Sequence, residues 1–326
     1  MITIRNSKKK INLYSYRVIK HVQRSIYKVK KGQKDKGITS QDKEDEFNYL
    51  KNLIDYNDKY KTRLLDDDDT NRYGNIRCYK DNFVEISSPH KVINASWIHI
   101  PYEKSFISAQ APMYNTIDDF WTMCFDYNIK IIVMLCNLEE NGMEKCVEYW
   151  ENENIFISGF QTNFSINYTS EKINDDITIR NIKIKDKTKE ENFEKEIKQI
   201  HYGSWPDHQS VDIQSIYGNI LFMFNLVDNE IGKSPILVHC SAGVGRTGTF
   251  LALYNLYRDI LNQIHANTSK ITISFLNLVR KFKEMRLHLV ETEEQYGLIY
   301  QFVIILIKFC YNFFVYPLYY QNLLRA

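Results

Sequence analysis

Cysteine is scarce in this sequence, and the six that occur are scattered. No two of them form a Cys-x-x-Cys pair, and the eight histidines show no cluster at zinc-binding spacing. These absences argue against a structural zinc site and fit a reducing, cytoplasmic setting. We therefore expect no metal and no cofactor, and we expect no specific nucleic-acid partner.

The sequence also lacks a secretory signal and a clean membrane span. Lysines occupy positions 8–10, but no apolar core follows them. The stretch 302–320 is very apolar, yet Lys308, Asn312 and Pro317 interrupt it before it reaches the roughly 20 residues that a span needs. Two readings stay open for it: a core helix with an apolar end, or weak contact with a membrane.

Charge is unevenly distributed along the chain. Residues 1–40 carry twelve Lys or Arg and a single acid, Asp35, whereas the whole chain has a formal charge of only +2. We expect a flexible basic arm over 1–43, either solvated, in contact with acidic lipid headgroups, or used for nuclear targeting.

The remaining length is enough for one sizeable domain. The chain has 326 residues, 44% of them hydrophobic and 25% charged, which is typical of a globular protein. No internal repeat is present. We predict a packed catalytic domain over 44–308 and an apolar tail over 309–326.

Hydrophobic periodicity predicts an alternation of strands and helices. Thr116 with Asp119 resembles a capping box that opens a helix. The buried face of that helix is predicted to hold Phe120, Met123, Cys124 and Tyr127. Apolar runs or alternation predict strands at 131–135, 155–168, 176–184, 196–202 and 236–239. Helices are predicted after a Gly-rich loop near 245 and over 273–286 and 293–308. The predicted fold class is α/β (α+β), with a mixed twisted sheet flanked by helices.

The loop from Cys240 to Arg246 has the residue types of an anion-binding loop. A strand that ends in Cys, followed by small residues and Gly, lets successive backbone N–H groups turn inward at a helix N-terminus. Ala242, Gly243 and Gly245 keep bulky side chains out of this nest. The residues predicted to bind phosphate through their backbone are Ser241, Ala242, Gly243, Val244 and Gly245.

The same loop carries a nucleophile and its partners. The inward N–H groups and the helix dipole favour the thiolate of Cys240. Arg246 offers a planar fork to two phosphoryl oxygens, and the Thr247 hydroxyl can donate to the sulfur. A structural cysteine beside a Gly-rich turn is the alternative, but all residues of 238–250 fit the catalytic loop.

With these residues the chain resembles the tyrosine-specific protein phosphatases, whose loop reads His-Cys-x5-Arg and includes His239 here. The resemblance covers about 45–308. It rests on matching segments at 71–73, 93–98, 106–112, 116–121, 140–150, 205–208 and 291–296. It implies that the substrates are tyrosine-phosphorylated proteins. The composition and single-domain layout also resemble phosphatases of the bracoviruses of parasitoid wasps, which would place the action in host-cell cytoplasm.

The resemblance assigns roles to residues outside the loop. Asp207 would protonate the leaving tyrosyl oxygen and then activate water, with Trp205 as the hinge of its mobile loop. Glu140 would brace Arg246, and Lys145 would pair with Asp207. Glu140 and Lys145 as plain surface charges are the alternative.

Recognition of the substrate ring is expected of Tyr73, which would line a deep slot that only a phenyl phosphate can fill. Arg72 beside it is expected to be structural. A phosphatase for other phosphomonoesters, such as phosphoinositides, is a further alternative, but such enzymes lack the Asn-Arg-Tyr segment found here at 71–73.

Three positions depart from the family pattern. Asn75 stands where many members have an Asp that holds substrate amides, and Val92 replaces a Tyr. Glu291 takes the place of the first Gln of the water-positioning segment, although Gln295 remains. A Glu can accept but not donate, so we expect slower hydrolysis of the phosphocysteine intermediate. Asn75 and Glu291 support one alternative, a weakly active phosphotyrosine-binding decoy.

Overall fold

The structure is a computed structural model that describes most of the chain between residues 40 and 307. The described ranges are 40–88, 90–100, 105–151, 162–189, 194–205, 213–230, 234–266 and 272–307. The basic arm up to residue 39, the tail from 308 onward and Asp207 lie outside them.

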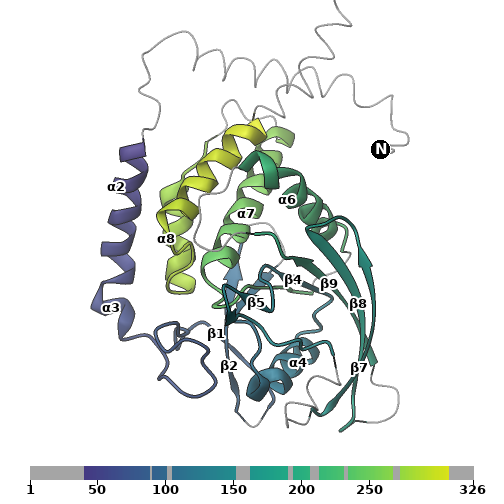
Figure 1. Cartoon of the computed structure of the whole chain (residues 1–326). Helices are drawn as coiled ribbons and strands as arrows, with labels where there is room; N and C mark the ends of the chain where they lie inside the picture. Colours follow the sequence, from purple (N-terminus) through teal and green to yellow (C-terminus); the bar gives the residue numbers. More distant parts are fainter. Residues whose placement is uncertain are drawn as a thin grey trace, which may run out of the picture.

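The described part contains ten strands and eight helical segments, together with a last helix over 293–307 (Figure 1). The strands are β1 (Phe83–Glu85), β2 (Val92–His99), β3 (Ser105–Ala109), β4 (Ile131–Met134), β5 (Glu139–Glu140), β6 (Met143–Glu144), β7 (Phe164–Lys172), β8 (Ile177–Asp186), β9 (Glu194–Tyr202) and β10 (Ile236–His239). The helical segments are α2 (Ser40–Leu50), the π-helix η1 (Lys51–Asp55), α3 (Asp58–Lys61), the 3-10 helix η2 (Tyr114–Thr116), α4 (Ile117–Asp126), α6 (Ile213–Asp228), α7 (Gly245–His265) and α8 (Phe275–Met285).

Eight of the strands form one mixed sheet in the order β1-β2-β3-β10-β4-β9-β8-β7. β10 runs parallel to both β3 and β4, and β4 runs parallel to β9. The outer strands pair antiparallel on each side. Figure 1 shows α6, α7 and α8 on one side of this sheet and α4 on the other. The α/β (α+β) prediction is therefore confirmed.

Burial explains why the centre of the sheet is parallel. Every residue of β4 and of β10 is buried, as expected for strands covered by helices on both faces. β8, nearer the edge, alternates between buried and more exposed residues. In parallel sheets, ligand sites form beyond the carboxyl ends of the strands. The loop that starts at Cys240, directly after β10, occupies this position.

Several predicted boundaries need correction. α2 begins at Ser40, four residues before the predicted start of the packed domain. β7 begins at Phe164 and runs on to Lys172, past the predicted end at 168. The last six residues of β7 are all exposed, so they lack the alternation that the prediction relied on, while pairing with β8 keeps them extended.

The predicted capping box at the start of α4 is wrong in its contacts, although the helix is confirmed. Thr116 is the N-cap residue but makes no side-chain cap bond; its hydroxyl accepts from the Met113 N–H at 2.9 Å. The Asp119 carboxylate pairs with His90 Nδ1 at 2.7 Å instead. Phe120, Met123 and Cys124 are buried as predicted, whereas the side chain of the predicted fourth member of this face, Tyr127, is only partly buried.

The N-terminal helical segments pack against the C-terminal ones. α2 lies beside α8 (Figure 1), and the Glu46 carboxylate accepts hydrogen bonds from the hydroxyls of Tyr296 and Tyr300. The π-helix η1 places Asp55 in the core, where it forms a 2.9 Å ion pair with buried Lys283. Among the described residues, no helix has both the length and the apolar character needed to cross a membrane.

Candidate active site

The loop after β10 is shaped by hydrogen bonds to its carbonyl groups. The Ser241 carbonyl accepts from the Ala111 N–H at 2.9 Å. The Gly243 carbonyl accepts from the Ser108 hydroxyl at 2.8 Å, and also from Arg286. Because these carbonyls are held on the protein side of the loop, its N–H groups are left to face the other side, which is what an anion-binding nest requires.

Glycine is required at two positions of this loop. Gly243 has φ +70, and a Cβ there would lie 2.2 Å from the Ala109 carbonyl oxygen. A Cβ at Gly245 would lie 2.8 Å from Gln295 Nε2 and 3.0 Å from Glu291 Oε2. The first glycine therefore allows a left-handed turn against β3, and the second keeps open the space beside the 291–295 turn.

Arg246, at the start of α7, is held in place by the carboxylate of Glu140 in β5. Its Nη1 and Nη2 donate to the two oxygens of Glu140 at 2.7 and 3.0 Å, and Nη1 also contacts the Trp205 carbonyl oxygen at 3.4 Å. The Arg246 side chain is only 2% exposed. A paired guanidinium fork fixed in this way can present its remaining N–H groups to a planar or tetrahedral oxyanion.

A cavity of about 190 Å³ opens in front of this loop. It brings together most of the residues that the sequence singled out, from four separate segments of the chain. The lining consists of Tyr73, Asn75, Ile76, Lys145, Cys240, Ser241, Ala242, Gly245, Arg246, Glu291 and Gln295. Cys240 is almost fully buried, and it is one of the residues that line this cavity. The volume suits a small oxyanion and part of an aromatic ring.

Tyr73 is tied to the loop at the rim of the cavity. Its hydroxyl lies 2.9 Å from the Ser241 hydroxyl, which in turn donates to the Lys145 carbonyl oxygen at 3.0 Å. Since the Ser241 proton is used in that second bond, Tyr73 is the donor in the first. Arg72 points away and binds the Pro112 carbonyl oxygen at 2.7 Å and the Glu144 carboxylate at 3.2 Å.

The protein-tyrosine phosphatase family model matches residues 67–305. The chain belongs to the protein-tyrosine phosphatase family.

Its relatives include receptor-type tyrosine-protein phosphatases. The mouse receptor-type tyrosine-protein phosphatase eta is 34% identical over 77% of this chain and 20% of its own length. The Drosophila tyrosine-protein phosphatase 69D is also 34% identical, over 71% of this chain and 16% of its own length. This phosphatase chain therefore spans about a fifth of the length of the curated relatives it matches.

A solved structure shares the architecture. The catalytic domain of human protein tyrosine phosphatase non-receptor type 18 is 25% identical, with a TM-score of 0.66 over 81% of this chain and 96% of that one. The likeness supports the mixed sheet flanked by helices described above.

Behind the phosphatase loop, His239 belongs to a buried chain of hydrogen bonds. Gln199 donates to the Tyr149 hydroxyl at 2.7 Å, and that hydroxyl lies 2.9 Å from His239 Nε2. The tyrosine proton therefore points to Nε2, which leaves Nδ1–H to donate to the Cys240 carbonyl at 3.1 Å. Burial lowers the pKa of His239 to about 3, so the ring is neutral and orients the nucleophile's backbone.

A functional residue that the sequence reasoning missed is Arg286. It is fully buried behind the loop and donates to the carbonyls of Gly243 at 3.0 Å and Ala242 at 3.1 Å. It also contacts the Asn94 side chain at 2.7 Å and Cys78 Sγ at 3.0 Å. An Arg directly after a helix looks like a surface charge in sequence, and no local pattern marks this one.

The remaining predicted site residues have mixed outcomes. Val244 and Thr247 are buried, and the Thr247 hydroxyl has no hydrogen-bond partner among the described residues, Cys240 included. Trp205 is buried with its ring edge-on to Tyr202 at 6.0 Å. Asp207 lies outside the described residues, so its role and its pairing with Lys145 stay predictions.

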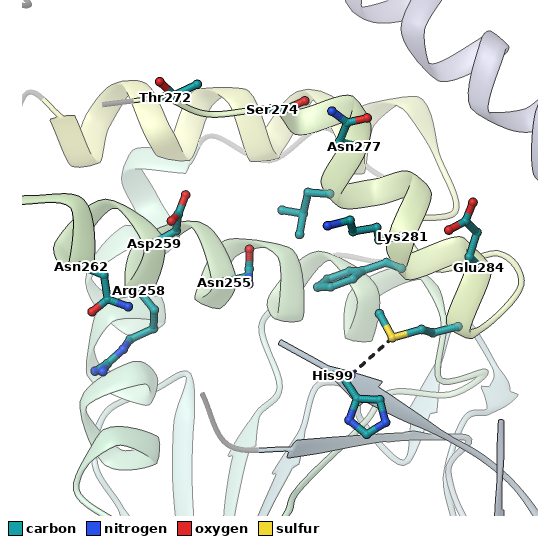
Figure 2. A pocket seen from close by; sticks show the side chains of 13 residues that line it. His99, Asn255, Arg258, Asp259, Asn262, Thr272, Ser274, Asn277, Lys281 and Glu284 are labelled. Carbon is teal, nitrogen blue, oxygen red and sulfur yellow. Dashed lines mark hydrogen bonds between the residues drawn. The ribbon is translucent and has the colours of Figure 1, made fainter. Parts of the chain in front are cut away.

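A larger cavity elsewhere shows that size alone does not identify the site. It measures about 720 Å³ and lies between α7 and α8, with His99 of β2 at one end (Figure 2). Figure 2 shows Arg258, Asp259 and Asn262 on α7, and Asn277 on the facing side. None of the predicted catalytic or binding residues lines it.

Proposed function

We propose that this chain hydrolyses phosphotyrosine in proteins through a phosphocysteine intermediate. One observation carries the proposal: Cys240 and the Glu140-braced Arg246 share a small cavity whose rim holds Tyr73. An oxyanion in that cavity meets inward N–H groups, a helix N-terminus and a guanidinium fork together.

In the first step, the Cys240 thiolate attacks phosphorus and the bond to the tyrosyl oxygen breaks. The electron pair of that bond leaves with the oxygen, which takes a proton from Asp207. Arg246 and the loop N–H groups stabilise the charge that spreads over the three other phosphoryl oxygens. The products are a dephosphorylated tyrosine and phosphocysteine.

In the second step, water attacks the phosphocysteine. A bond forms between the water oxygen and phosphorus, a proton passes to Asp207, and the S–P bond breaks to restore the thiolate and release phosphate. Gln295 can donate through Nε2 to this water or to the phosphate, because its Oε1 already accepts from the Glu291 and Thr292 N–H groups at 2.9 and 3.3 Å.

Selectivity for tyrosine follows from the position of Cys240 at the base of a slot. Tyr73 and Asn75 line the cavity together with Cys240. A phenyl ring is long enough to carry phosphate past Tyr73 to the sulfur, whereas the short serine side chain is not. We expect phosphoserine peptides to react much more slowly than matched phosphotyrosine peptides.

Turnover of a phosphotyrosine peptide tests the proposal, with phosphate release as the readout and Cys240→Ser as the negative control. Cys146→Ser is a matched control because Cys146 is buried but does not line the cavity. We expect activity in the wild type and in Cys146→Ser only. A wild type no faster than Cys240→Ser would instead leave a phosphotyrosine-binding decoy, which the intact Arg246–Glu140 pair does not favour.

The natural substrates are proposed to be cytoplasmic phosphoproteins, since a thiolate nucleophile requires a reducing setting. Mass spectrometry of proteins retained by an Asp207→Ala variant would identify them. A viral origin, with action in host-cell cytoplasm, is part of the same proposal and rests on the sequence resemblance alone.

A further inference from the structure

A carboxylate lines the cavity that is otherwise built for anions. Glu291 is one of the lining residues, and its Oε2 would lie 3.0 Å from a Cβ placed on Gly245 of the loop. Gln295, on the same turn, lies on the same side. Carboxylates accept hydrogen bonds and repel dianions, so Glu291 must change which form of a phosphoryl group the cavity accepts.

The charges around Glu291 are of both signs. Arg246 of α7 already shares its charge with Glu140 in a two-bond ion pair. In the proposed mechanism the Cys240 thiolate adds a negative charge to the same cavity. Within the described residues, the cations near it include Lys145, which lines the cavity, and Lys283 of α8, which is buried and paired with Asp55.

Among the cavity-lining side chains of its own turn, Glu291 has no competing free acceptor. The backbone N–H groups of Glu291 and Thr292 donate to Gln295 Oε1. The acceptor side of the Gln295 amide is thus occupied, and Gln295 offers only its Nε2 donors to a ligand. Among the described residues of this turn that line the cavity, the Glu291 carboxylate is therefore the side-chain acceptor available to a protonated phosphoryl oxygen.

We propose that Glu291 makes the cavity selective for the monoanionic, singly protonated form of a phosphoryl group. The phosphoryl O–H donates to the Glu291 carboxylate, while Arg246 and the loop N–H groups bind the unprotonated oxygens. The inference rests on the proposed function for the location of the phosphoryl group. Because the second ionisation of a phosphomonoester occurs near pH 6, affinity decreases as the pH rises above that value.

Two inorganic anions test this selectivity without turnover. Near neutral pH inorganic phosphate passes from a dianion that carries one proton to a monoanion that carries two, whereas sulfate stays an unprotonated dianion over the whole range. Calorimetric binding of each to the full chain at pH 6 and pH 8 gives the comparison. We expect sulfate to bind about tenfold more weakly than phosphate at pH 6, from the Coulomb repulsion of a nearby carboxylate.

Glu291→Gln removes the charge and keeps the shape. We expect this variant to bind sulfate about tenfold more tightly than the wild type does. We also expect its phosphate affinity to fall between pH 6 and pH 8 by a factor about ten times smaller than the factor for the wild type. The comparison with wild type cancels the titration of phosphate itself. Glu294→Gln is the matched control, since Glu294 is an exposed carboxylate on the same turn, and should bind both anions as the wild type does.

Equal binding of phosphate and sulfate by the wild type at pH 6 would overturn the inference, even if Glu291→Gln failed to fold. So would a folded Glu291→Gln variant with unchanged affinities. These binding results are separate from the proposed function, whose failure would appear as absent turnover of phosphotyrosine peptide by the wild type.

Discussion

A buried arginine lies at the front of the phosphatase loop and another at its back, and the two differ in their hydrogen-bond partners. Arg246, at the front, faces the cavity and is paired with the Glu140 carboxylate. Arg286, at the back, binds neutral groups: loop carbonyls, the Asn94 amide oxygen, the Ser96 hydroxyl and Cys78 Sγ. Within the described residues no carboxylate is among its hydrogen-bond partners.

The difference indicates that the charge of Arg246 is available for binding a ligand, whereas that of Arg286 stabilises the fold. The charge of Arg246 is held in place by a partner that leaves donors for a ligand. All five donors of Arg286 are directed at the fold, so its removal leaves buried acceptors without a partner. Substitutions at the front should therefore change rates, and those at the back should change stability.

The largest effect is expected for Arg246→Lys. A lysine keeps the charge opposite Glu140 but loses the two-pronged geometry, so kcat for a phosphotyrosine peptide should fall about 10³-fold. The free energy of unfolding should change by about 1 kcal/mol or less. Steady-state kinetics and urea unfolding of the same preparation check both parts. A large loss of stability with little loss of kcat would reverse the comparison.

At the back, Arg286→Met should destabilise the fold by about 3 kcal/mol, because the carbonyls of Ala242 and Gly243 lose their buried donor. Urea unfolding measures this. Arg280→Met, a substitution on the partly buried surface of α8 nearby, serves as the control and should cost less. If both variants unfolded at the same urea concentration, Arg286 would have no special structural role.

The next expected effect is a dependence of stability on pH that comes from His239. Burial lowers its pKa to about 3, whereas an unfolded His titrates near 6.5. Protons therefore bind the unfolded state first, and stability falls as pH drops from about 6.5 to about 3, by up to about 1.4 kcal/mol per unit. His239→Gln should flatten this slope in urea unfolding at several pH values.

His90 provides a control of opposite sign. Its hydrogen bond with Asp119 raises the pKa of His90, so its contribution is present below about pH 6.5 and is lost as the pH rises through the raised value. His90→Gln should lower stability at acidic pH and leave the slope due to His239 in place. An unchanged slope in His239→Gln would show that other groups cause the acid sensitivity.

The smallest effect is expected at the front rim. Tyr73→Phe keeps the ring but loses the bond to Ser241, so kcat/KM for a phosphotyrosine peptide should fall by about two- to tenfold. Tyr73→Ala also loses the ring and should fall further. The ratio of the two variants measures how much the slot wall contributes apart from its hydroxyl. Equal losses would assign the whole effect to the hydrogen bond.

The front of the loop was predictable from sequence, and the back was not. Cys240 and Arg246 lie in one contiguous run whose glycines and buried strand have a local signal. Arg286 contacts the loop only because α8 ends beside β2 and β10, which no local pattern reveals. The cap at Thr116 was mispredicted because its hydroxyl is used by the preceding turn, and Asp119 is used by His90.

The hydrogen bonds that shape the loop have a consequence for how the chain matures. Donors to its carbonyls come from Ser108, Ala111 and Arg286, so segments that shape the nest lie at least 130 residues before it and more than 40 after it. A ribosome must therefore release residues well beyond Arg286 before the nest can form. We therefore expect a nascent or truncated chain that ends before Arg286 to have no phosphatase activity, even though it contains Cys240. Activity would then indicate that the fold is complete.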